Sequence, residues 1–238
     1  MEKLTKALIL AAGFGSRLRP LTNDTPKALL KINGKTLLEL VIGKLINSGI
    51  EEFIVNVHHH RSKMLDYLSR NDFGKKISVS EENEILGTGG GIKNTAGFFA
   101  GCKSFLVYNV DIVSGIDIRK LYEFHMKFQP TATLAIQMRD TSRPLIFDHE
   151  NSLVGRMQSD TEKIYKNPSG KTFLAGFCGV HILSGEIFND FQETGTFDIF
   201  TTYFRLVAGN KNILGCDIGD CPWRDVGTFS DFHSLSSE

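Results

Sequence analysis

The sequence is poor in the features that mark several large classes of protein. Its 238 residues include only four cysteines, which form no CxxC pair and no zinc-type Cys/His spacing. The sequence therefore predicts neither a zinc site nor a disulfide framework, and free thiols fit a reducing cytoplasm. The 27 Lys and Arg residues balance the 27 Asp and Glu residues, so the charge gives no indication of a nucleic-acid partner.

Long apolar runs are also missing. Residues 7–12 follow a lysine as the core of a signal peptide would, but glycines and arginines come directly afterwards. A membrane-spanning helix needs about 18–20 apolar residues, and no segment approaches that length. We therefore expect a cytoplasmic protein with no membrane partner. The sequence leaves the oligomeric state open.

The order of apolar segments predicts an α/β domain of helices packed on a largely parallel or mixed sheet. We expect one domain over residues 1–238. Strands are predicted near 6–11, 53–57, 76–80, 104–109, 131–137, 172–181 and 212–216. Helices are predicted near 35–48, 61–70, 91–99, 118–127, 197–206 and 229–236. Turn-forming residues accumulate at 139–170 and predict a hairpin-like insertion that could cover a pocket.

A glycine-rich segment follows the first predicted strand. It reads Ala11-Ala12-Gly13-Phe14-Gly15-Ser16-Arg17, and Lys27 follows ten residues after Arg17. Glycines after a buried strand let backbone N–H groups approach a ligand closely, and such donors suit phosphate oxygens. Arg17 and Lys27 could add positive charge. A tight turn with two solvated basic residues is the alternative interpretation.

Two better-known nucleotide motifs do not fit. The dinucleotide fingerprint GxGxxG lacks its third glycine here, and its acidic residue at the end of the second strand is replaced by Asn56-Val57-His58-His59. The triplet Gly34-Lys35-Thr36 resembles a P-loop, but Leu29 stands where that motif requires glycine. The sequence therefore disfavours both dinucleotide and P-loop binding.

Three more segments carry candidate chemistry. Gly87-Thr88-Gly89-Gly90-Gly91 could pack its backbone flat against a base, although a flexible loop would also contain glycines. Asp111 follows an apolar strand at the edge where open α/β sheets bind ligands. Asp225 lies in a second short segment, between Trp223 and Gly227. Each aspartate taken alone could equally be a turn former or a helix cap.

In order and spacing, these segments resemble the sugar-phosphate nucleotidyltransferase family. The resemblance rests on Leu10–Thr22, Pro26-Lys27, Gly34–Glu39, Leu86–Ile92, Asn109-Val110-Asp111 and Trp223–Thr228, which span nearly the whole chain. It is similar to the short members, such as N-acetylmuramate 1-phosphate uridylyltransferases and mannose or heptose 1-phosphate guanylyltransferases. The resemblance implies a Rossmann-like, GT-A-like mixed-sheet domain with α/β/α layers.

The resemblance also implies a reaction, in which a sugar 1-phosphate attacks the α-phosphorus of a nucleoside triphosphate and pyrophosphate leaves. Arg17 would hold the leaving part, Lys27 would bridge the reacting phosphates, and Asp111 and Asp225 would hold Mg²⁺. The implied nucleotide contacts are Ala11, Ala12, Gly13, Gly15, Ser16, Arg17, Gly87, Thr88 and Gly90. The implied sugar contacts are Asn109 and Gly179. The family further implies NDP-sugar synthesis for the cell envelope.

The substrates stay open at this point. UTP and GTP are favoured as donors, and CTP or dTTP fit as well. Val110-Asp111 replaces the Gly-Asp pair of many relatives, and Glu162-Lys163-Ile164 replaces their Glu-Lys-Pro sugar clamp, so the sugar is not identified. A cytidylyltransferase for a non-sugar phosphate such as phosphocholine is one alternative. A non-catalytic nucleotide-sensing module is another, disfavoured because the four charged residues are all present.

Several reactive side chains have simpler explanations. His58, His59 and His60 are adjacent, so they point in different directions and are not expected to bind zinc together. Cys178 has no visible general base beside it and is expected to be a packing residue. His125 and His181 have no evident partner in the sequence.

Overall fold

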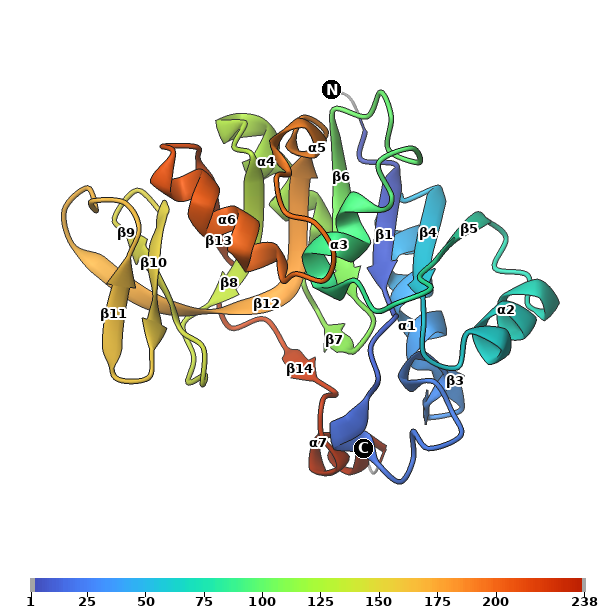
Figure 1. Ribbon diagram of the computed structural model, residues 1–238. Helices are drawn as coiled ribbons and strands as arrows, with labels where there is room; N and C mark the ends of the chain where they lie inside the picture. Colours follow the sequence, from blue (N-terminus) through green and yellow to red (C-terminus); the bar gives the residue numbers. More distant parts are fainter. Residues whose placement is uncertain (1–2, 237–238) are drawn as a thin grey trace.

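One mixed sheet runs through the molecule, with helices on both of its faces (Figure 1). The computed structural model describes residues 3–236, so the ends of the predicted 1–238 domain lie outside the described residues. The described sheet has ten strands in the order β11 (Thr161–Ile164), β10 (Leu153–Gln158), β9 (Leu145–Asp148), β12 (Thr172–Ser184), β6 (Ser104–Asn109), β1 (Lys6–Leu10), β4 (Glu52–Val57) and β5 (Lys76–Glu81), and β8 (Ala132–Gln137) joins β13 (Ile213–Asp217) to β12. Strands β1, β4, β5 and β6 are mutually parallel, whereas β12 is antiparallel to β6.

The predicted α/β pattern is confirmed by the observed elements. The helices are α1 (Leu37–Asn47), α2 (Arg61–Arg70), α3 (Gly87–Lys93), α4 (Ile118–Phe128), α5 (Ile187–Asp190), α6 (Ile199–Ala208) and α7 (Phe229–Ser236). The sequence did not predict two short 3₁₀ turns, η1 (Ser16–Leu18) and η2 (Lys27–Leu29). It also did not predict two small two-stranded ribbons, β2 (Lys31–Ile32) with β3 (Lys35–Thr36) and β7 (Ile112–Ser114) with β14 (Trp223–Asp225).

Alternate side chains of the central strands face two separate cores. In β1, Ala7 and Ile9 pack into one core and Leu8 into the other, as the two-residue period of a strand requires. Helices α1, α2, α4 and α7 contribute to the first core, and α3, α5 and α6 contribute to the second. The layers are therefore α/β/α, as the resemblance implied. Among the described residues, no helix combines the length and apolarity needed to cross a membrane.

The segment at 139–170 forms strands β9 to β11, which continue the sheet beyond the central strands. Strand β12 joins the two parts, because its first residues pair with β9 and its last residues pair with β6 (Figure 1). Its pairing with β8 shifts register between Phe177 and His181. Residues 139–170 are not among those that line the main cleft of the described structure. A role of this segment in covering a pocket stays a prediction.

The helix predicted at 91–99 is wrong in its bounds. Helix α3 begins at Gly87 and ends at Lys93, and residues 94–101 form turns. Glycine has a low helix propensity, so the pattern placed the helix after the glycines instead of over them. Tertiary packing overrides that propensity, because a Cβ on Gly89 would lie 2.3 Å from the Phe197 ring. Only glycine allows this helix to approach its neighbour so closely.

The segment that resembled a P-loop has a purely structural role. Gly34 has a φ of 82° and closes the turn between β2 and β3. Thr36 caps helix α1, since its hydroxyl accepts from the Glu39 N–H while the Glu39 carboxylate accepts from the Thr36 N–H. The hydrogen bond from the Thr36 backbone lowers the pKa of Glu39. These contacts leave no phosphate-binding role for the triplet.

Two histidines without evident partners in the sequence are buried and hydrogen-bonded. His125 Nδ1 lies 2.9 Å from Thr133 Oγ1, and His181 Nδ1 lies 2.6 Å from the Tyr203 hydroxyl. Burial lowers the pKa of His125 to about 4 and that of His181 to about 3. Both rings are therefore neutral structural groups at neutral pH, and the sequence could not show their partners, which lie on other elements.

These histidines predict acid lability. In the unfolded chain they titrate near 6.5, so the unfolded state binds more protons and stability falls as the pH drops from about 6.5 toward 4. Each histidine is expected to contribute up to about 1.4 kcal/mol per pH unit in that window. Urea unfolding of the wild type and of His125→Gln at pH 7, 6 and 5 measures this slope. An equal slope for the two proteins would contradict the assignment.

Candidate active site

The main cleft lies at the carboxyl ends of three parallel strands. Leu10 at the end of β1 is in register with Asn56 of β4 on one side and with Asn109 of β6 on the other. This is the edge at which open α/β sheets bind ligands. The cleft is lined by Leu10, Ala11, Ala12, Gly13, Phe14, Gly15, Ser16, Arg17, Lys27, Asn56, Glu82, Ile85, Gly87, Thr88, Asn109, Val110, Asp111 and Gly227.

The first glycine segment forms a tight turn that brings its two basic residues to the cleft. Gly15 has a φ of 62° and starts η1, and its carbonyl accepts from the Thr22 hydroxyl at 2.8 Å. A Cβ on Gly15 would lie 3.0 Å from Thr22 and 3.3 Å from the Lys27 side chain. Glycine is therefore required both by the backbone angle and by the close approach of Lys27. Arg17 and Lys27 both line the cleft.

A buried hydrogen-bond chain joins the two glycine segments. Asn56 Oδ1 accepts from the Ala11 N–H at 2.7 Å, and Asn56 Nδ2 donates to Glu82 Oε1 at 2.7 Å. The other carboxylate oxygen, Glu82 Oε2, accepts from the Leu86 N–H at 2.9 Å. Both side chains are only 2% exposed. The chain therefore fixes the spacing between the loop after β1 and the start of α3.

Opposite charges meet at the other side of the cleft. Lys27 Nζ lies 2.5 Å from Asp111 Oδ2, and the lysine side chain is only 11% exposed. The pair joins η2 to the residue that follows β6, so it connects segments 84 residues apart in sequence. Because it is largely shielded from water, its electrostatic attraction is stronger than that of a surface ion pair.

Asp225 approaches this pair from the C-terminal part of the chain. Strand β14 pairs with β7, which places Asp225 opposite Ile112, and the Val226 N–H donates to the Asp111 carbonyl at 2.8 Å. Burial, and then the negative charge of Asp111, raise the pKa of Asp225. A Cβ on Gly227 would lie 2.8 Å from both Arg17 Nη2 and Asp225 Oδ1. Arg17, Asp225 and the Asp111 segment therefore converge on one region.

The carboxylates at this position suit a hard divalent cation. Asp225 Oδ1 is buried and has no hydrogen-bond partner among the described residues, which leaves a carboxylate oxygen available for a ligand. Carboxylate oxygens together with phosphate oxygens and water are the donors that Mg²⁺ prefers. Within residues 3–236, no group of three or more His, Cys, Asp or Glu side chains converges on a metal position. Asp111 and Asp225 therefore fit a Mg²⁺ ion that takes its remaining ligands from substrate and water.

The second glycine segment divides its roles between the cleft and the protein. Gly87 and Thr88 line the cleft. Gly90 is not among the cleft-lining residues, and an added Cβ would lie 2.9 Å from Leu86 and 3.0 Å from the Gly195 carbonyl. Gly91 similarly packs against Asn56 and Glu82. Close approach to other protein segments explains the glycines at 89 to 91, and the contact of Gly90 with a nucleotide stays a prediction.

The two predicted sugar contacts lie beside each other. Asn109 ends β6 and lines the cleft. Gly179 of β12 has a φ of 71°, and a Cβ there would lie 2.6 Å from Ile112 and 3.2 Å from Asn109 Nδ2. Val180 of β12 pairs with Tyr108 of β6, which brings the backbone of Gly179 beside the end of β6. Gly179 is not among the cleft-lining residues, so its contact with a sugar stays a prediction.

Sequence reasoning missed several cleft residues. Asn56 is the single polar residue in the buried run Phe53–Val57, and that position at the end of a strand was a usable signal. Glu82 gave no such signal, since its neighbours in the sequence are also acidic or polar. Phe14 lines the cleft with 44% of its surface exposed, and its ring meets those of His58 and His59 edge-on.

The reactive side chains set aside from the sequence have protein partners. His58 Nδ1 lies 3.0 Å from the Glu82 carbonyl, and His60 Nε2 lies 3.3 Å from the Thr22 carbonyl. Cys178 is buried, its Sγ donates to the Gly176 carbonyl, and burial raises its pKa to about 11. A thiol with so high a pKa is a poor nucleophile at neutral pH.

The fold and the cleft define an α/β protein whose site suits a polyphosphate ligand with a divalent cation. The nucleotidyl transferase family matches residues 6–238, which is nearly the whole chain. The chain belongs to this family.

Named relatives of similar length agree with this assignment. The chain is 34% identical over 235 residues to the D-glycero-alpha-D-manno-heptose 1-phosphate guanylyltransferase of Campylobacter jejuni, covering 96% of this chain and 97% of that protein. It is 37% identical over 214 residues to the N-acetylmuramate alpha-1-phosphate uridylyltransferase of Caulobacter vibrioides, covering 86% and 85% of the two chains. The crystal structure of HddC from Yersinia pseudotuberculosis has the same fold, with a TM-score of 0.80 at 22% identity over 98% of this chain and 99% of that chain.

The buried chain through Asn56 predicts a large effect on stability. Asn56→Ala leaves the Ala11 N–H and one oxygen of the buried Glu82 carboxylate without a partner, and this is expected to cost about 2–3 kcal/mol of unfolding free energy. The matched control is Asn71→Ala, which removes an exposed side-chain bond to the Tyr67 carbonyl and should change stability by less than about 0.5 kcal/mol. Urea unfolding compares the two variants, and equal effects would contradict the role of Asn56.

Proposed function

We propose that the protein transfers a nucleoside monophosphate from UTP or GTP to a sugar 1-phosphate, releasing pyrophosphate. The observation that carries the proposal is the convergence of Arg17, Lys27, Asp111 and Asp225 beside a cleft lined with glycine backbone. The heptose and muramate enzymes that the chain resembles act on phosphorylated sugars by name. A cytoplasmic location is part of the proposal, since the four cysteines are free.

In this proposal the basic residues hold the reacting phosphates. Both substrates are anions, so bringing the acceptor phosphate to the α-phosphorus requires positive charge at the reacting centre. Arg17 has a planar group that can bind two phosphate oxygens of the leaving pyrophosphate at once. Lys27 lies deeper, between Gly15 and Asp111, where its ammonium can contact both the attacking and the attacked phosphate. Catalysis then comes from positioning and charge neutralisation, without a covalent intermediate.

Asp111 and Asp225 are proposed to hold Mg²⁺. A bound Mg²⁺ supplies positive charge that neutralises phosphate oxygens as negative charge builds up on them. Lys27 is hydrogen-bonded to Asp111 in the structure, so the same ammonium that contacts substrate also keeps this carboxylate oriented. The unpartnered Asp225 Oδ1 is the oxygen of that side chain available to the ion.

The nucleoside part is proposed to lie along the two glycine segments. Ala11, Ala12, Gly13, Gly15 and Ser16 present backbone on one side, and Gly87 and Thr88 do so on the other. The sugar is proposed to lie toward Asn109 and Gly179. The family implies NDP-sugar synthesis, and the cell envelope is its proposed destination.

The first test is pyrophosphate release with each nucleoside triphosphate, paired with muramate, mannose, glucose and heptose 1-phosphates. One pair with UTP or GTP is expected to be turned over in Mg²⁺, and EDTA is expected to stop the reaction until Mg²⁺ is restored. Asp111→Asn should lower the rate by about 10²–10³. Turnover only of CTP with phosphocholine would support the non-sugar alternative, and nucleotide binding without turnover would support a sensing module.

Arg17 can be tested against a matched arginine two residues away. Arg17→Lys keeps the charge but loses the planar two-oxygen contact, so kcat/KM is expected to fall by about 10²-fold. Arg19→Lys makes the same exchange at an exposed position of the same loop that is not among the cleft-lining residues, and its activity should be close to that of the wild type. Steady-state kinetics with the pair identified above measures both. Equal losses in the two variants would contradict a specific role for Arg17.

A further inference from the structure

A segment that does not line the cleft supports the back of helix α3. Residues 193–199 comprise most of the connection between α5 and α6 together with the first residue of α6, and they run alongside α3 (Figure 1). The Thr196 hydroxyl donates to the Ile85 carbonyl at 2.6 Å, and the Phe197 N–H donates to the Leu86 carbonyl at 3.0 Å. The acceptors, Ile85 and Leu86, directly precede Gly87 in the sequence, and Ile85 itself lines the cleft.

The contacts continue through the glycine turn itself. The Ile199 N–H donates to Thr88 Oγ1 at 2.9 Å, and the Phe197 carbonyl accepts from the Gly89 N–H at 3.0 Å. A Cβ on Gly87 would lie 2.5 Å from the Phe197 carbonyl oxygen. The two backbones are therefore packed without spare room, and a shift of the 193–199 segment must also shift Gly87 and Thr88.

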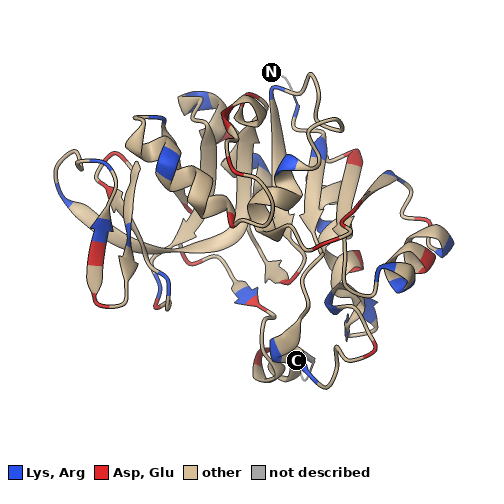
Figure 2. Ribbon diagram, viewed as in Figure 1, with Lys and Arg blue, Asp and Glu red and all other residues tan. Residues whose placement is uncertain are grey.

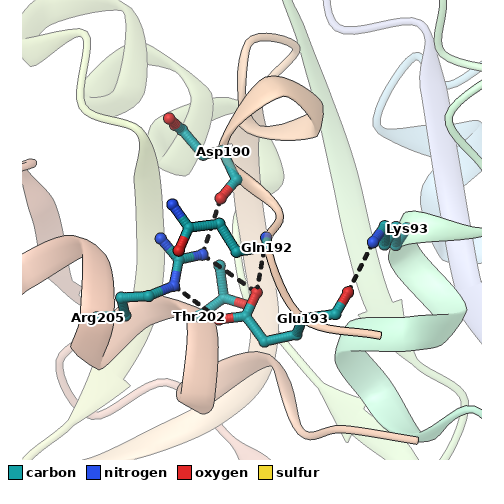
Figure 3. Close-up of polar contacts among 6 residues, drawn as sticks. All are labelled: Lys93, Asp190, Gln192, Glu193, Thr202 and Arg205. Atoms are coloured by element: carbon teal, nitrogen blue, oxygen red, sulfur yellow. Dashed lines mark hydrogen bonds and ion pairs between the residues drawn. The ribbon is translucent and has the colours of Figure 1, made fainter. Parts of the chain in front are cut away.

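Glu193 anchors this segment at one end. Its carboxylate forms a two-point contact with Arg205 of α6, with Nε to Oε1 at 2.9 Å and Nη2 to Oε2 at 3.1 Å, and the Thr202 hydroxyl donates to Oε2 at 2.9 Å (Figure 3). The Glu193 side chain is only 13% exposed. Burial raises its pKa, but the hydrogen bonds from Arg205, from its own backbone and from Thr202, together with the charge of Arg205, outweigh that effect and lower the pKa to about 2. The contact is thus a fixed ionic one at neutral pH.

Glu193 and Arg205 also contact α3 and the end of α5 directly. Lys93 Nζ, from the last turn of α3, donates to the Glu193 carbonyl at 2.6 Å (Figure 3). Arg205 Nη2 also donates to the Asp190 carbonyl at 2.8 Å. Glu193 therefore contacts α3 through its carbonyl and α6 through its carboxylate, and Arg205 also contacts the end of α5. None of these charged groups is among the residues that line the cleft.

We propose that Glu193 and Arg205 are positioning residues for the nucleotide: they hold the 193–199 segment against α3 and so set the place of Ile85, Gly87 and Thr88 in the cleft. The inference rests on the proposed function, in that the cleft must bind a nucleoside triphosphate. It assigns Glu193 and Arg205 to the binding of the donor nucleotide and not of the acceptor, because their hydrogen bonds reach only the α3 side of the cleft.

The test is the affinity for the nucleoside triphosphate that the wild type uses, measured by calorimetry, together with steady-state kinetics. Glu193→Gln is expected to weaken nucleotide binding and raise the nucleotide KM by about tenfold, the usual range for a residue that orients a contacting group. The KM for the sugar phosphate should stay within about twofold of the wild-type value, because these hydrogen bonds reach only the α3 side of the cleft. Arg205→Lys, which keeps charge and loses one of two contacts, should have a smaller effect of the same kind.

Controls separate positioning from general stability. Arg70→Lys changes an exposed ion pair with Asp66 on α2 and should leave nucleotide affinity unchanged. Thr196→Val removes only the exposed hydroxyl bond to Ile85. If Glu193→Gln does not fold, weaker nucleotide binding by Thr196→Val supports the inference and unchanged binding contradicts it. A lower melting temperature with unchanged nucleotide affinity, or an equal rise in both KM values, would overturn the inference. Failure of the wild type to bind any nucleotide would instead overturn the proposed function.

Discussion

The hydrogen-bond chain from Ala11 through Asn56 and Glu82 to Leu86 is the contact on which the cleft depends. It ties the loop after β1 to the start of α3 across the end of β4, at three distances of 2.7 to 2.9 Å. Because both polar side chains are buried, each group must keep its partner or incur the cost of desolvation. The width of the cleft between the two glycine segments is therefore set by the core and not by a ligand.

Charged side chains gather at one end of this cleft, whereas elsewhere in the molecule the two signs are interspersed. Figure 2 shows basic and acidic residues interspersed over the elements, in keeping with 27 residues of each sign. At the site, by contrast, Lys27 and Asp111 are paired and Asp225 is held close by through β14. Burial raises the pKa of Asp225 and the negative charge of Asp111 raises it further, an arrangement that a cation relieves. An overall neutral protein can therefore bind two anionic substrates through a few local groups.

The glycines near the cleft have two different roles. Gly15 serves a backbone turn beside Lys27, whereas Gly89, Gly90 and Gly91 allow α3 to pack against the 193–199 segment and the Asn56–Glu82 pair. The α3 side of the cleft is thus a thin layer of backbone with packed protein behind it. Contacts at Glu193 and Arg205 can reach the cleft through that layer because a close-packed interior transmits displacements.

The sequence by itself determined the α/β class, most of the elements and the loop that carries Arg17 and Lys27, because periodicity and glycine turns are local properties. It also located Asp111 and Asp225 through motifs, although their roles with Mg²⁺ stay proposals. Tertiary structure alone decided that α3 begins at Gly87, that Glu82 lies in the cleft and that His181 faces Tyr203. Those features depend on which residues approach from distant parts of the chain, and the local pattern of a sequence does not contain that information.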